Sequence, residues 1–503
     1  MSVKSNTSKK AELTTEEIAE IRKKADDYFY KNDYLQSIKY YELHTKYDKK
    51  CSSSYEMLGW LYYFIDIEKS VKNYIKAFNL SYQINYIDYD SFGNFMLALT
   101  RHPNYTQSQL KKLIENFVKK VKRKTLTSKE VFKHPKTTQL HRKLNIGYLS
   151  SDLYTHATMQ FILPILKNHN TNVFNIFFYY AGTYNDNLTQ FLMQKPYIFK
   201  NVNEKSFKEI AQTVYDDKID ILIDLSSLTH KYALTMLYKP APVQISYMGF
   251  LNTTGMKEVD YIIADKDTIP EEQNDEYTEN ILYLPRYECF EFTNNISSYI
   301  KETPLPYKRN GFITFGSFNC TSKINKNVLR CWSEIIKRNP TARLYIYRSN
   351  MTNEVIEQIT KVLKKFKTDM SRVIIDNTDY GFHFDIYKDA DIALDTFPFT
   401  GLTITVELAH IGVPVITKVC DTFSSKGGMR INKALGCEEL ITYSDEEYIN
   451  AATELANDIP RLEKYRKNLR NNLEKSLLYD QKLFTKYFET GLIKAINKYY
   501  GLE

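Results

Sequence analysis

The pattern of hydrophobic and polar positions changes once along this chain of 503 residues. Up to about residue 120, hydrophobic side chains recur every three or four positions, which predicts amphipathic helices. From residue 144 onward, short hydrophobic runs such as "LNIGYLSSD" and "IDILIDLS" alternate with segments of helical period such as "SFKEIAQTVYDD". Buried strands that alternate with helices predict an α/β fold with doubly wound, mostly parallel sheets.

The helical region repeats itself. The segments "YLQSIKYYELH" (34–44) and "IEKSVKNYIKA" (67–77) align without gaps, so that Ser37 matches Ser70 and Tyr41 matches Tyr74. A helix–turn–helix unit of about 34 residues, with small and aromatic residues at fixed offsets, is typical of tetratricopeptide repeats. We predict an all-α, tetratricopeptide-like domain at 14–125. A plain amphipathic bundle is the alternative.

A second set of strand–helix alternations follows the segment "LPYKRNG" at 305–311, which is rich in Pro, Gly and charge. It runs from "FITFGSFN" through "DIALDTF" to "VPVIT", and the final residues are helical and charged. We predict two Rossmann-like domains, at 141–308 and 309–480, and a C-terminal helix at 481–503. Ligands are expected in the cleft between the carboxyl ends of the two sheets.

Composition adds little to this picture. The net charge of +8 is a mild basic excess that does not by itself indicate nucleic acid. Ten Lys or Arg fall between positions 119 and 143 against one acid, Glu130. We interpret 126–140 as a solvated basic linker; a nucleic-acid or membrane patch is the alternative.

The remaining features indicate a cytoplasmic protein. The polar segment 1–13, which we expect to be disordered, lacks the hydrophobic core of a signal peptide, and no run approaches the roughly 20 apolar residues of a membrane span. The six cysteines show no metal-ligand spacing and are expected to be reduced. The "DAD" at 389–391 is interpreted as a helix cap and turn, so no metal is implied.

The segment "LDTFPFTGLTITVELAHIGVPVIT" predicts a strand, a turn, a short helix and a second strand. Gly401 would let a ligand approach the backbone closely, and a helix that starts near Thr403 would offer unpaired N–H groups to a phosphate. Thr403 and Thr405 could add hydroxyl donors. Glu407, one turn further, could accept both hydroxyls of a ribose; favourable placement early in a helix is the alternative.

Three further residues lie at the same predicted sheet edges. Lys323, in "SFNCTSKINKN", follows the first strand of the second half and could neutralise a diphosphate. His383 precedes another strand there, and His156 follows the first strand of the first half, on the opposite wall. Each has an ordinary alternative, as a solvated, packing or capping side chain.

Together these segments resemble the family of O-linked N-acetylglucosamine transferases that includes the SPINDLY proteins. The resemblance covers about 140–480 and rests on four blocks in order: "IGYLSSDLYTH", "LYKPAPVQISYMGFLNTTGMKEVDYIIAD", "SFNCTSKIN" and "FHFDIYKDADIALDTFPFTGLTITVELAHIGVPVIT". It implies the GT-B fold, two facing Rossmann-like domains, and a metal-independent, inverting transfer that needs no cofactor beyond the UDP-sugar co-substrate.

The resemblance also implies roles for individual residues. His156 falls on the active-site His, Lys323 on the diphosphate-contacting Lys, His383 on the uracil-stacking His and Glu407 on the ribose-binding acid. The donors to the diphosphate fall on Thr403 and Ile404. We also include Gly249, from the turn "GFLNT", among the nucleotide-sugar residues.

Several positions depart from the family pattern. Cys320 stands where Gln is common, which removes one hydrogen bond to the diphosphate. Leu402 and Ile404 replace a His and a Thr, and Phe399 stands at the position of a Cys near the N-acetyl group. We therefore keep glucose or another hexose as the alternative donor sugar.

We predict an enzyme that moves GlcNAc from UDP to Ser or Thr hydroxyls of proteins, whose acceptors bind partly through the helical repeats. A hexosyltransferase acting on Ser, Thr or Asn side chains, or on a small molecule, is the first alternative. A repeat scaffold with a decayed nucleotide site is the second. Nucleic acid and a membrane span are not expected as partners or features.

Overall fold

The computed structural model describes residues 13–126, 130–135, 142–194, 196–293, 303–381 and 383–502. Of the expected tail at 1–13, only residue 13 lies inside these ranges. Of the predicted linker at 126–140, residues 127–129 and 136–140 lie outside them. The chain forms two compact units that divide between Asp88 and Tyr89. The predicted repeat region is therefore split, because its last two helices belong to the larger unit.

The smaller unit is a pair of helical hairpins. Its elements are α1 (Thr15–Tyr30), α2 (Tyr34–Tyr47), α3 (Ser52–Tyr62) and α4 (Ile67–Gln83). The aligned serines make the same bond: Ser37 Oγ donates to the Ala25 carbonyl at 3.0 Å, and Ser70 Oγ donates to the Gly59 carbonyl at 2.7 Å. The sequence repeat thus corresponds to a structural repeat, in which each small residue lets a second helix approach the first.

The larger unit begins with α5 (Tyr89–Arg101) and α6 (Gln107–Thr125), followed by a seven-stranded sheet of order β3-β2-β1-β4-β5-β6-β7. All its strand pairs are parallel, with Ile146 opposite both Ile176 and Ile221. The strands are β1 (Leu144–Ser150), β2 (Phe174–Tyr180), β3 (Ile198–Asn201), β4 (Ile221–Asp224), β5 (Val243–Ser246), β6 (Tyr261–Ala264) and β7 (Asn280–Tyr283). The helices that connect them are α7 (Met159–Asn168), α8 (Asn187–Leu192) and α9 (Phe207–Asp216).

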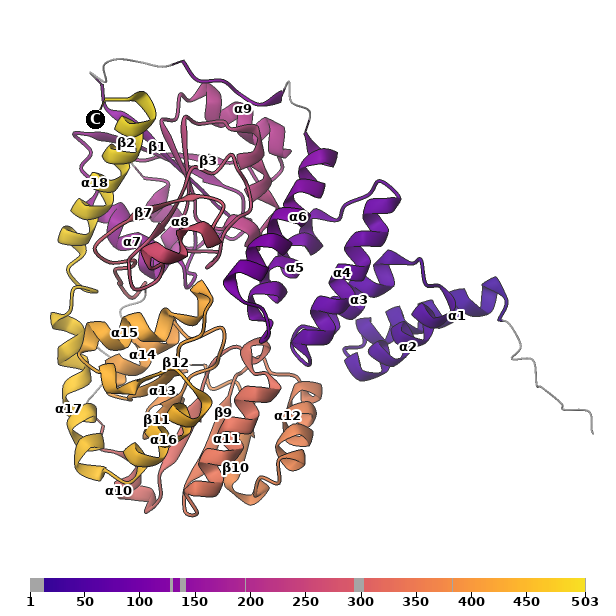
Figure 1. The fold of residues 1–503 in the computed structure, drawn as a ribbon, viewed down its shortest axis with the longest axis vertical. Coiled ribbons are helices and arrows are strands. Elements are labelled where there is room, and N and C mark those ends of the chain that lie inside the picture. The colour runs from indigo at the N-terminus through magenta and orange to yellow at the C-terminus, as the bar shows by residue number, and fades with distance from the viewer. Residues whose placement is uncertain are drawn as a thin grey trace, which may run out of the picture. The chain divides into compact units, whose positions relative to one another are not determined.

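The second sheet has six parallel strands in the order β10-β9-β8-β11-β12-β13. Its strands are β8 (Thr314–Ser317), β9 (Arg343–Tyr347), β10 (Val373–Asp376), β11 (Ile392–Leu394), β12 (Val415–Lys418) and β13 (Ile441–Thr442). The helices are α10 (Pro306–Asn310), α11 (Lys326–Arg338), α12 (Asn353–Lys365), α13 (Phe384–Tyr387), α14 (Thr403–Ile411), α15 (Gly427–Leu435), α16 (Asp445–Ala456) and α17 (Ile459–Lys475). The predicted pair of Rossmann-like halves is confirmed (Figure 1).

The last helix, α18 (Gln481–Tyr500), returns to the first sheet and packs on α7 (Figure 1). Glu489 on α18 accepts a hydrogen bond from His169 Nδ1 at 2.9 Å. The C-terminal segment thus crosses from the second half back to the first, which ties the two halves together.

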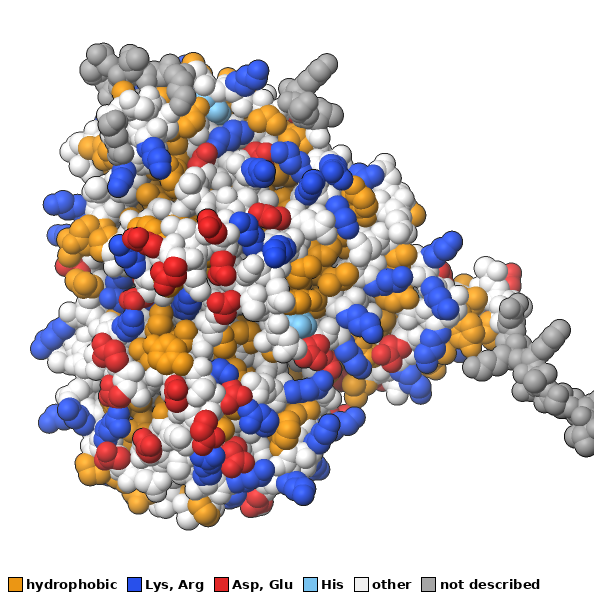
Figure 2. Space-filling model, in the orientation of Figure 1, with side chains coloured by type: hydrophobic (Ala, Val, Ile, Leu, Met, Phe, Trp, Pro, Cys, Tyr) orange, Lys and Arg blue, Asp and Glu red, His pale blue; other side chains and the backbone are white. Residues whose placement is uncertain are grey.

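Charge is distributed over the molecule. Lys and Arg side chains are interspersed with Asp and Glu on the face shown in Figure 2. Within the described part of the chain, no helix has the length and hydrophobicity needed to cross a bilayer.

Candidate active site

Both sheets reverse their strand order at one point, between β1 and β4 in the first and between β8 and β11 in the second. Loops at such switch points form the ligand crevice of doubly wound sheets. Those after β1, β8 and β11 carry His156, Lys323 and Gly401, and all three residues line one cavity of about 570 Å³. Its wall also includes Met248, Arg101, Arg348, His383, Phe399, Thr403, Ile404 and Glu407.

The N-terminus of α14 opens into this cavity. The residue before it, Leu402, provides no side-chain cap, and the first helical bond runs from the Val406 N–H to the Leu402 carbonyl at 3.2 Å. The N–H groups of Thr403 and Ile404 therefore lie at the positive end of the helix dipole, which attracts phosphate. Thr405 does not line the cavity, because its hydroxyl is buried and donates to the Gly401 carbonyl at 3.1 Å.

Asp395, at the end of β11, fixes the turn that leads to α14. Its carboxylate accepts hydrogen bonds from the Gly401 N–H at 2.7 Å and the Thr417 hydroxyl at 2.8 Å. Burial raises the pKa of Asp395 to about 6, although these donors oppose the shift. A Cβ on Gly401 would lie 3.1 Å from the Asn319 amide oxygen, so glycine keeps this turn compact. The turn is thus held from inside the domain, and its outer face remains available to a ligand.

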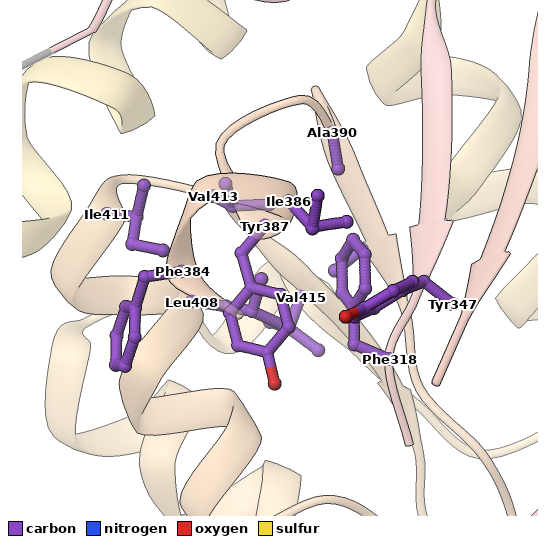
Figure 3. Close-up of a cluster of buried hydrophobic side chains, with 11 residues drawn as sticks. Phe318, Tyr347, Phe384, Ile386, Tyr387, Ala390, Leu408, Ile411, Val413 and Val415 are labelled. Atoms are coloured by element: carbon purple, nitrogen blue, oxygen red, sulfur yellow. The ribbon is translucent and has the colours of Figure 1, made fainter. Parts of the chain in front are cut away.

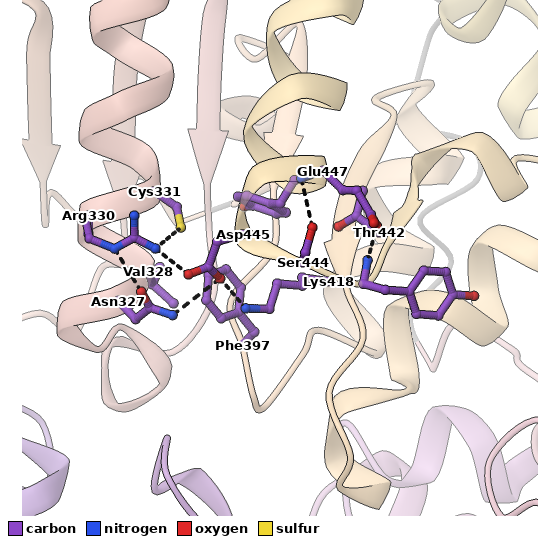
Figure 4. A network of polar contacts seen from close by, with 12 residues as sticks. Asn327, Val328, Arg330, Cys331, Phe397, Lys418, Thr442, Ser444, Asp445 and Glu447 are labelled. Atoms are coloured by element: carbon purple, nitrogen blue, oxygen red, sulfur yellow. Dashed lines mark hydrogen bonds and ion pairs between the residues drawn. The ribbon is translucent and has the colours of Figure 1, made fainter.

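A polar network lies against Phe397 of the same turn (Figure 4). Asp445, on α16, is paired with Arg330 of α11 and Lys418 of β12. The Lys418 ammonium also lies 4.1 Å from the centroid of the Phe397 ring. Three elements that are distant in sequence are therefore joined beside Phe397 of the 395–401 turn.

Lys323 extends from the loop after β8 toward this turn. Its ammonium donates to the Thr400 carbonyl at 3.0 Å and lies 4.6 Å from the centroid of the Phe399 ring. Burial and the nearby Arg101 guanidinium lower the pKa of Lys323 to about 8. Lys323 forms no ion pair with any carboxylate that the structure describes. A cation held this way is suited to an anionic ligand.

His383 and Glu407 lie together at the other end of the cavity. Their closest side-chain atoms, Nε2 and Oε2, are 3.6 Å apart. Glu407 is almost buried, whereas about half of the His383 side chain is exposed. A ring that is exposed on one face could stack on a base, and the carboxylate beside it could accept ribose hydroxyls.

An aromatic cluster supports this end of the site (Figure 3). Phe384 and Tyr387 of α13 pack with Phe318 and Tyr347 from the strand ends and with Leu408 of α14. Because α13 follows His383 directly and α14 carries Glu407, this hydrophobic packing sets the distance between the two side chains.

On the opposite wall, His156 is half-buried and its Nδ1 accepts the Thr158 N–H at 3.3 Å. Gly249, predicted as a nucleotide-sugar residue, does not line the cavity, although its neighbour Met248 does. A Cβ on Gly249 would lie 2.2 Å from the Leu225 carbonyl, so this glycine is required for packing against the end of β4.

The "DAD" segment at 389–391 does not line the cavity. Asp391 accepts the backbone N–H groups of Tyr307 and Thr314 at 2.9 Å each, so it holds the segments at α10 and β8 together rather than capping a turn of its own. A search of the described residues for three side chains able to share a metal ion finds one group, His44, Asp48 and Cys51, in the smaller unit.

The model of glycosyl transferase family 41 matches residues 114–294 and 297–488. The chain belongs to glycosyl transferase family 41. The predicted family resemblance is therefore confirmed. The match begins after α5 and includes every predicted site residue of this family-41 chain.

Curated relatives agree. The chain is 32% identical over 369 residues to the probable UDP-N-acetylglucosamine–peptide N-acetylglucosaminyltransferase SPINDLY of Arabidopsis thaliana, covering 71% of this chain and 40% of that protein. It is 31% identical over 361 residues to the protein of the same name from Solanum lycopersicum, covering 69% of this chain and 38% of that protein. The chain thus spans about two fifths of the length of these relatives.

A solved structure shares the fold. A point mutant of the Thermobaculum terrenum O-GlcNAc transferase superposes with a TM-score of 0.75 at 23% sequence identity, covering 97% of this chain and all of the other. This likeness supports the arrangement of helices and two parallel sheets.

Proposed function

We propose that this chain is an inverting, metal-independent glycosyltransferase that moves GlcNAc from UDP-GlcNAc to Ser or Thr hydroxyls of proteins. The observation that carries the proposal is that three features line one cavity: the His383–Glu407 pair, the N-terminus of α14 and Lys323. The His383–Glu407 pair suits a nucleobase with its ribose, and the other two features suit a diphosphate. The names of the plant relatives support GlcNAc as the sugar and peptide as the acceptor.

The reaction requires charge stabilisation at the leaving group. As the acceptor oxygen bonds to the sugar C1, the bond from C1 to the β-phosphate oxygen breaks, and the UDP gains negative charge. Lys323 and the N–H groups of Thr403 and Ile404 would stabilise that charge without a metal ion. Because they are already in place, little reorganisation is needed during the transfer.

The proton of the acceptor hydroxyl must leave as the new bond forms. His156 is our candidate on the acceptor wall, either as the base or as a positioning residue. With Nδ1 accepting the Thr158 N–H, a neutral imidazole carries its proton on Nε2 and donates to the acceptor or sugar. To act as a base through Nε2, the ring would have to give up its hydrogen bond from the Thr158 N–H and carry its proton on Nδ1 instead.

The identity of the sugar depends on one side of the cavity. Phe399, Leu402 and Ile404 line the site where animal relatives carry smaller or polar residues. Because these three positions depart from the family pattern, a hexose is the second candidate donor.

We propose that protein acceptors bind in part through the helical repeats. Aromatic side chains are exposed on the smaller unit, with Tyr30 81%, Tyr86 55% and Tyr47 47% exposed. Such side chains are common at protein-binding surfaces. A cytoplasmic location completes the proposal, in keeping with six cysteines that are all unpaired.

Thermal unfolding of the full chain with added UDP, UDP-GlcNAc, UDP-glucose or GDP tests the donor assignment. Binding to the folded state raises the midpoint, and the rise grows with the logarithm of the ratio of ligand concentration to Kd. We expect stabilisation by UDP and by UDP-GlcNAc, and less by GDP. No stabilisation by any of the four nucleotides would refute the proposed function.

A further inference from the structure

Arg101 lines the proposed donor cavity although it comes from the helical region, outside the family-matched segments that start at 114. It is the last residue of α5, which packs against the first half of the larger unit. Nothing in the local sequence, "LALTRHPNY", distinguishes this arginine from a surface residue at the end of a helix.

The Arg101 guanidinium lies beside Lys323. Its central carbon is 5.3 Å from the centroid of the Phe399 ring, and the Lys323 ammonium is 4.6 Å from the same centroid. Arg101 Nη1 also donates to Ser322 Oγ, in the short turn that carries Lys323. Two cations thus share one aromatic ring at one end of the cavity.

This arrangement is unfavourable without a ligand. Like charges that face each other away from bulk water repel. Burial and this repulsion lower the pKa of Lys323, and Cys320 and Asp395 offset only part of the shift. A ligand with two negative charges would relieve the repulsion at both side chains. A diphosphate fits that requirement better than a neutral sugar or a single carboxylate.

The backbone that presents Arg101 is fixed by both halves of the larger unit. Just beyond it, Gln107 Nε2 donates to Asn252 Oδ1 at 2.8 Å, and the Gln107 N–H donates to Asp421 Oδ2 at 2.8 Å. Within α5, a Cβ on Gly93 would lie 2.7 Å from the Thr229 carbonyl, so the helix contacts the first half closely. The backbone at Arg101 is therefore fixed by packing and hydrogen bonds, and it does not belong to an exposed loop.

We propose that Arg101 is a second diphosphate-binding residue, which acts with Lys323 on the leaving group. This inference rests on the proposed function. Cys320 lines the same cavity. Because a thiol is a weak donor, the guanidinium supplies a stronger, charged donor there from a different element.

Calorimetric titration of the full chain with uridine, UMP and UDP tests this inference. Charge-assisted hydrogen bonds to phosphate are strong, so Arg101→Met should weaken UDP binding by roughly ten- to a hundredfold. Uridine affinity should be unchanged, the loss for UMP should be smaller, and Arg101→Lys should recover part of the UDP affinity. Lys111→Met, which removes one positive charge from neighbouring α6 outside the cavity, is the matched control and should bind UDP like the wild type.

The outcomes separate the two claims. If the wild type binds no nucleotide, the proposed function fails, and this inference fails with it. If the wild type binds UDP and Arg101→Met binds it equally well, only the role of Arg101 is refuted. An equal loss of affinity for uridine and for UDP would also refute it, because that pattern indicates that Arg101 supports the structure of the site without contacting the diphosphate. Should Arg101→Met fail to fold, the ratio of UDP to uridine affinity in Arg101→Lys decides between these outcomes: an unchanged ratio refutes the role.

Discussion

At the scale of single residues, Lys323 has the most direct consequence for binding. Its pKa of about 8 lies below that of an ordinary lysine, so its positive charge is present at pH 7 and is lost as the pH rises above 8. If only the charged form holds the diphosphate, UDP affinity should fall by roughly tenfold between pH 7 and pH 9. Titration calorimetry at both pH values measures this.

Lys323→Arg is the control for that prediction, since a guanidinium stays charged at pH 9. The pH-dependent loss should disappear in this variant. An unchanged affinity of the wild type between pH 7 and pH 9 would contradict the assignment, as would an equal loss in Lys323→Arg.

The sequence alone could place Lys323, His383, Gly401 and Glu407 at one sheet edge, because each lies next to a predicted strand end and the carboxyl ends of parallel strands meet there. It could not place Arg101 or Arg348, whose positions depend on long-range packing. Thr405 and Gly249 are predicted from the sequence to contact the nucleotide-sugar, but neither residue lines the cavity. The Thr405 hydroxyl is bonded to the Gly401 carbonyl, and a side chain at position 249 would point into packed protein.

At the scale of elements, α14 depends on how it ends. Gly412 closes the helix with φ +86°, a left-handed backbone conformation that glycine adopts readily. A Cβ there would lie 2.4 Å from the Arg466 carbonyl of α17. Gly311 closes α10 with φ +74°, but nothing lies within 4 Å of its Cβ position.

These two glycines therefore form a matched pair. Both alanine substitutions carry the cost of a left-handed backbone, about 1 kcal/mol. Gly412→Ala adds a steric conflict with α17, so it should reduce the free energy of unfolding clearly more than Gly311→Ala, as measured by urea denaturation. It should also weaken UDP binding, because α14 carries the N–H groups that we propose to bind the diphosphate. Equal losses of stability in the two variants would contradict this account of α14.

Element types were predictable from hydrophobic periodicity, but the domain boundary was not. The helical period continues through α5 and α6, and only their contacts show that these two helices belong with the sheets. The hydrophobic faces of α5 and α6 could equally have packed on the repeat helices. The sequence pattern shows that each helix has such a face, but only the tertiary contacts show what covers it.

At the scale of the whole molecule, the two halves are joined by a buried ion pair. Arg430 Nε of α15 lies 2.9 Å from Glu288 Oε2, and both side chains are almost completely buried. Glu288 follows β7 of the first half, and Arg430 belongs to the second. Burial raises the pKa of Glu288, while Arg430 opposes that shift.

Removal of one partner should be costly. Arg430→Met leaves a buried carboxylate without its cation, which should lower the free energy of unfolding by about 3–5 kcal/mol. The double variant Glu288→Gln with Arg430→Met removes the uncompensated charge and should recover part of that loss. Chemical denaturation of both variants measures the difference. If the double variant were as unstable as Arg430→Met, the carboxylate would not be the source of the loss.

The central claim is that the cavity transfers GlcNAc from UDP to proteins. Intact-mass spectrometry of candidate acceptor proteins, after incubation with the full chain and UDP-GlcNAc, tests it most directly. The account predicts the added mass of N-acetylhexosamine with the wild type and no addition with Lys323→Ala, whose thermal midpoint without ligand should match that of the wild type. No addition from UDP-GlcNAc, addition only from UDP-glucose supplied in a parallel reaction, or full turnover by Lys323→Ala would contradict it.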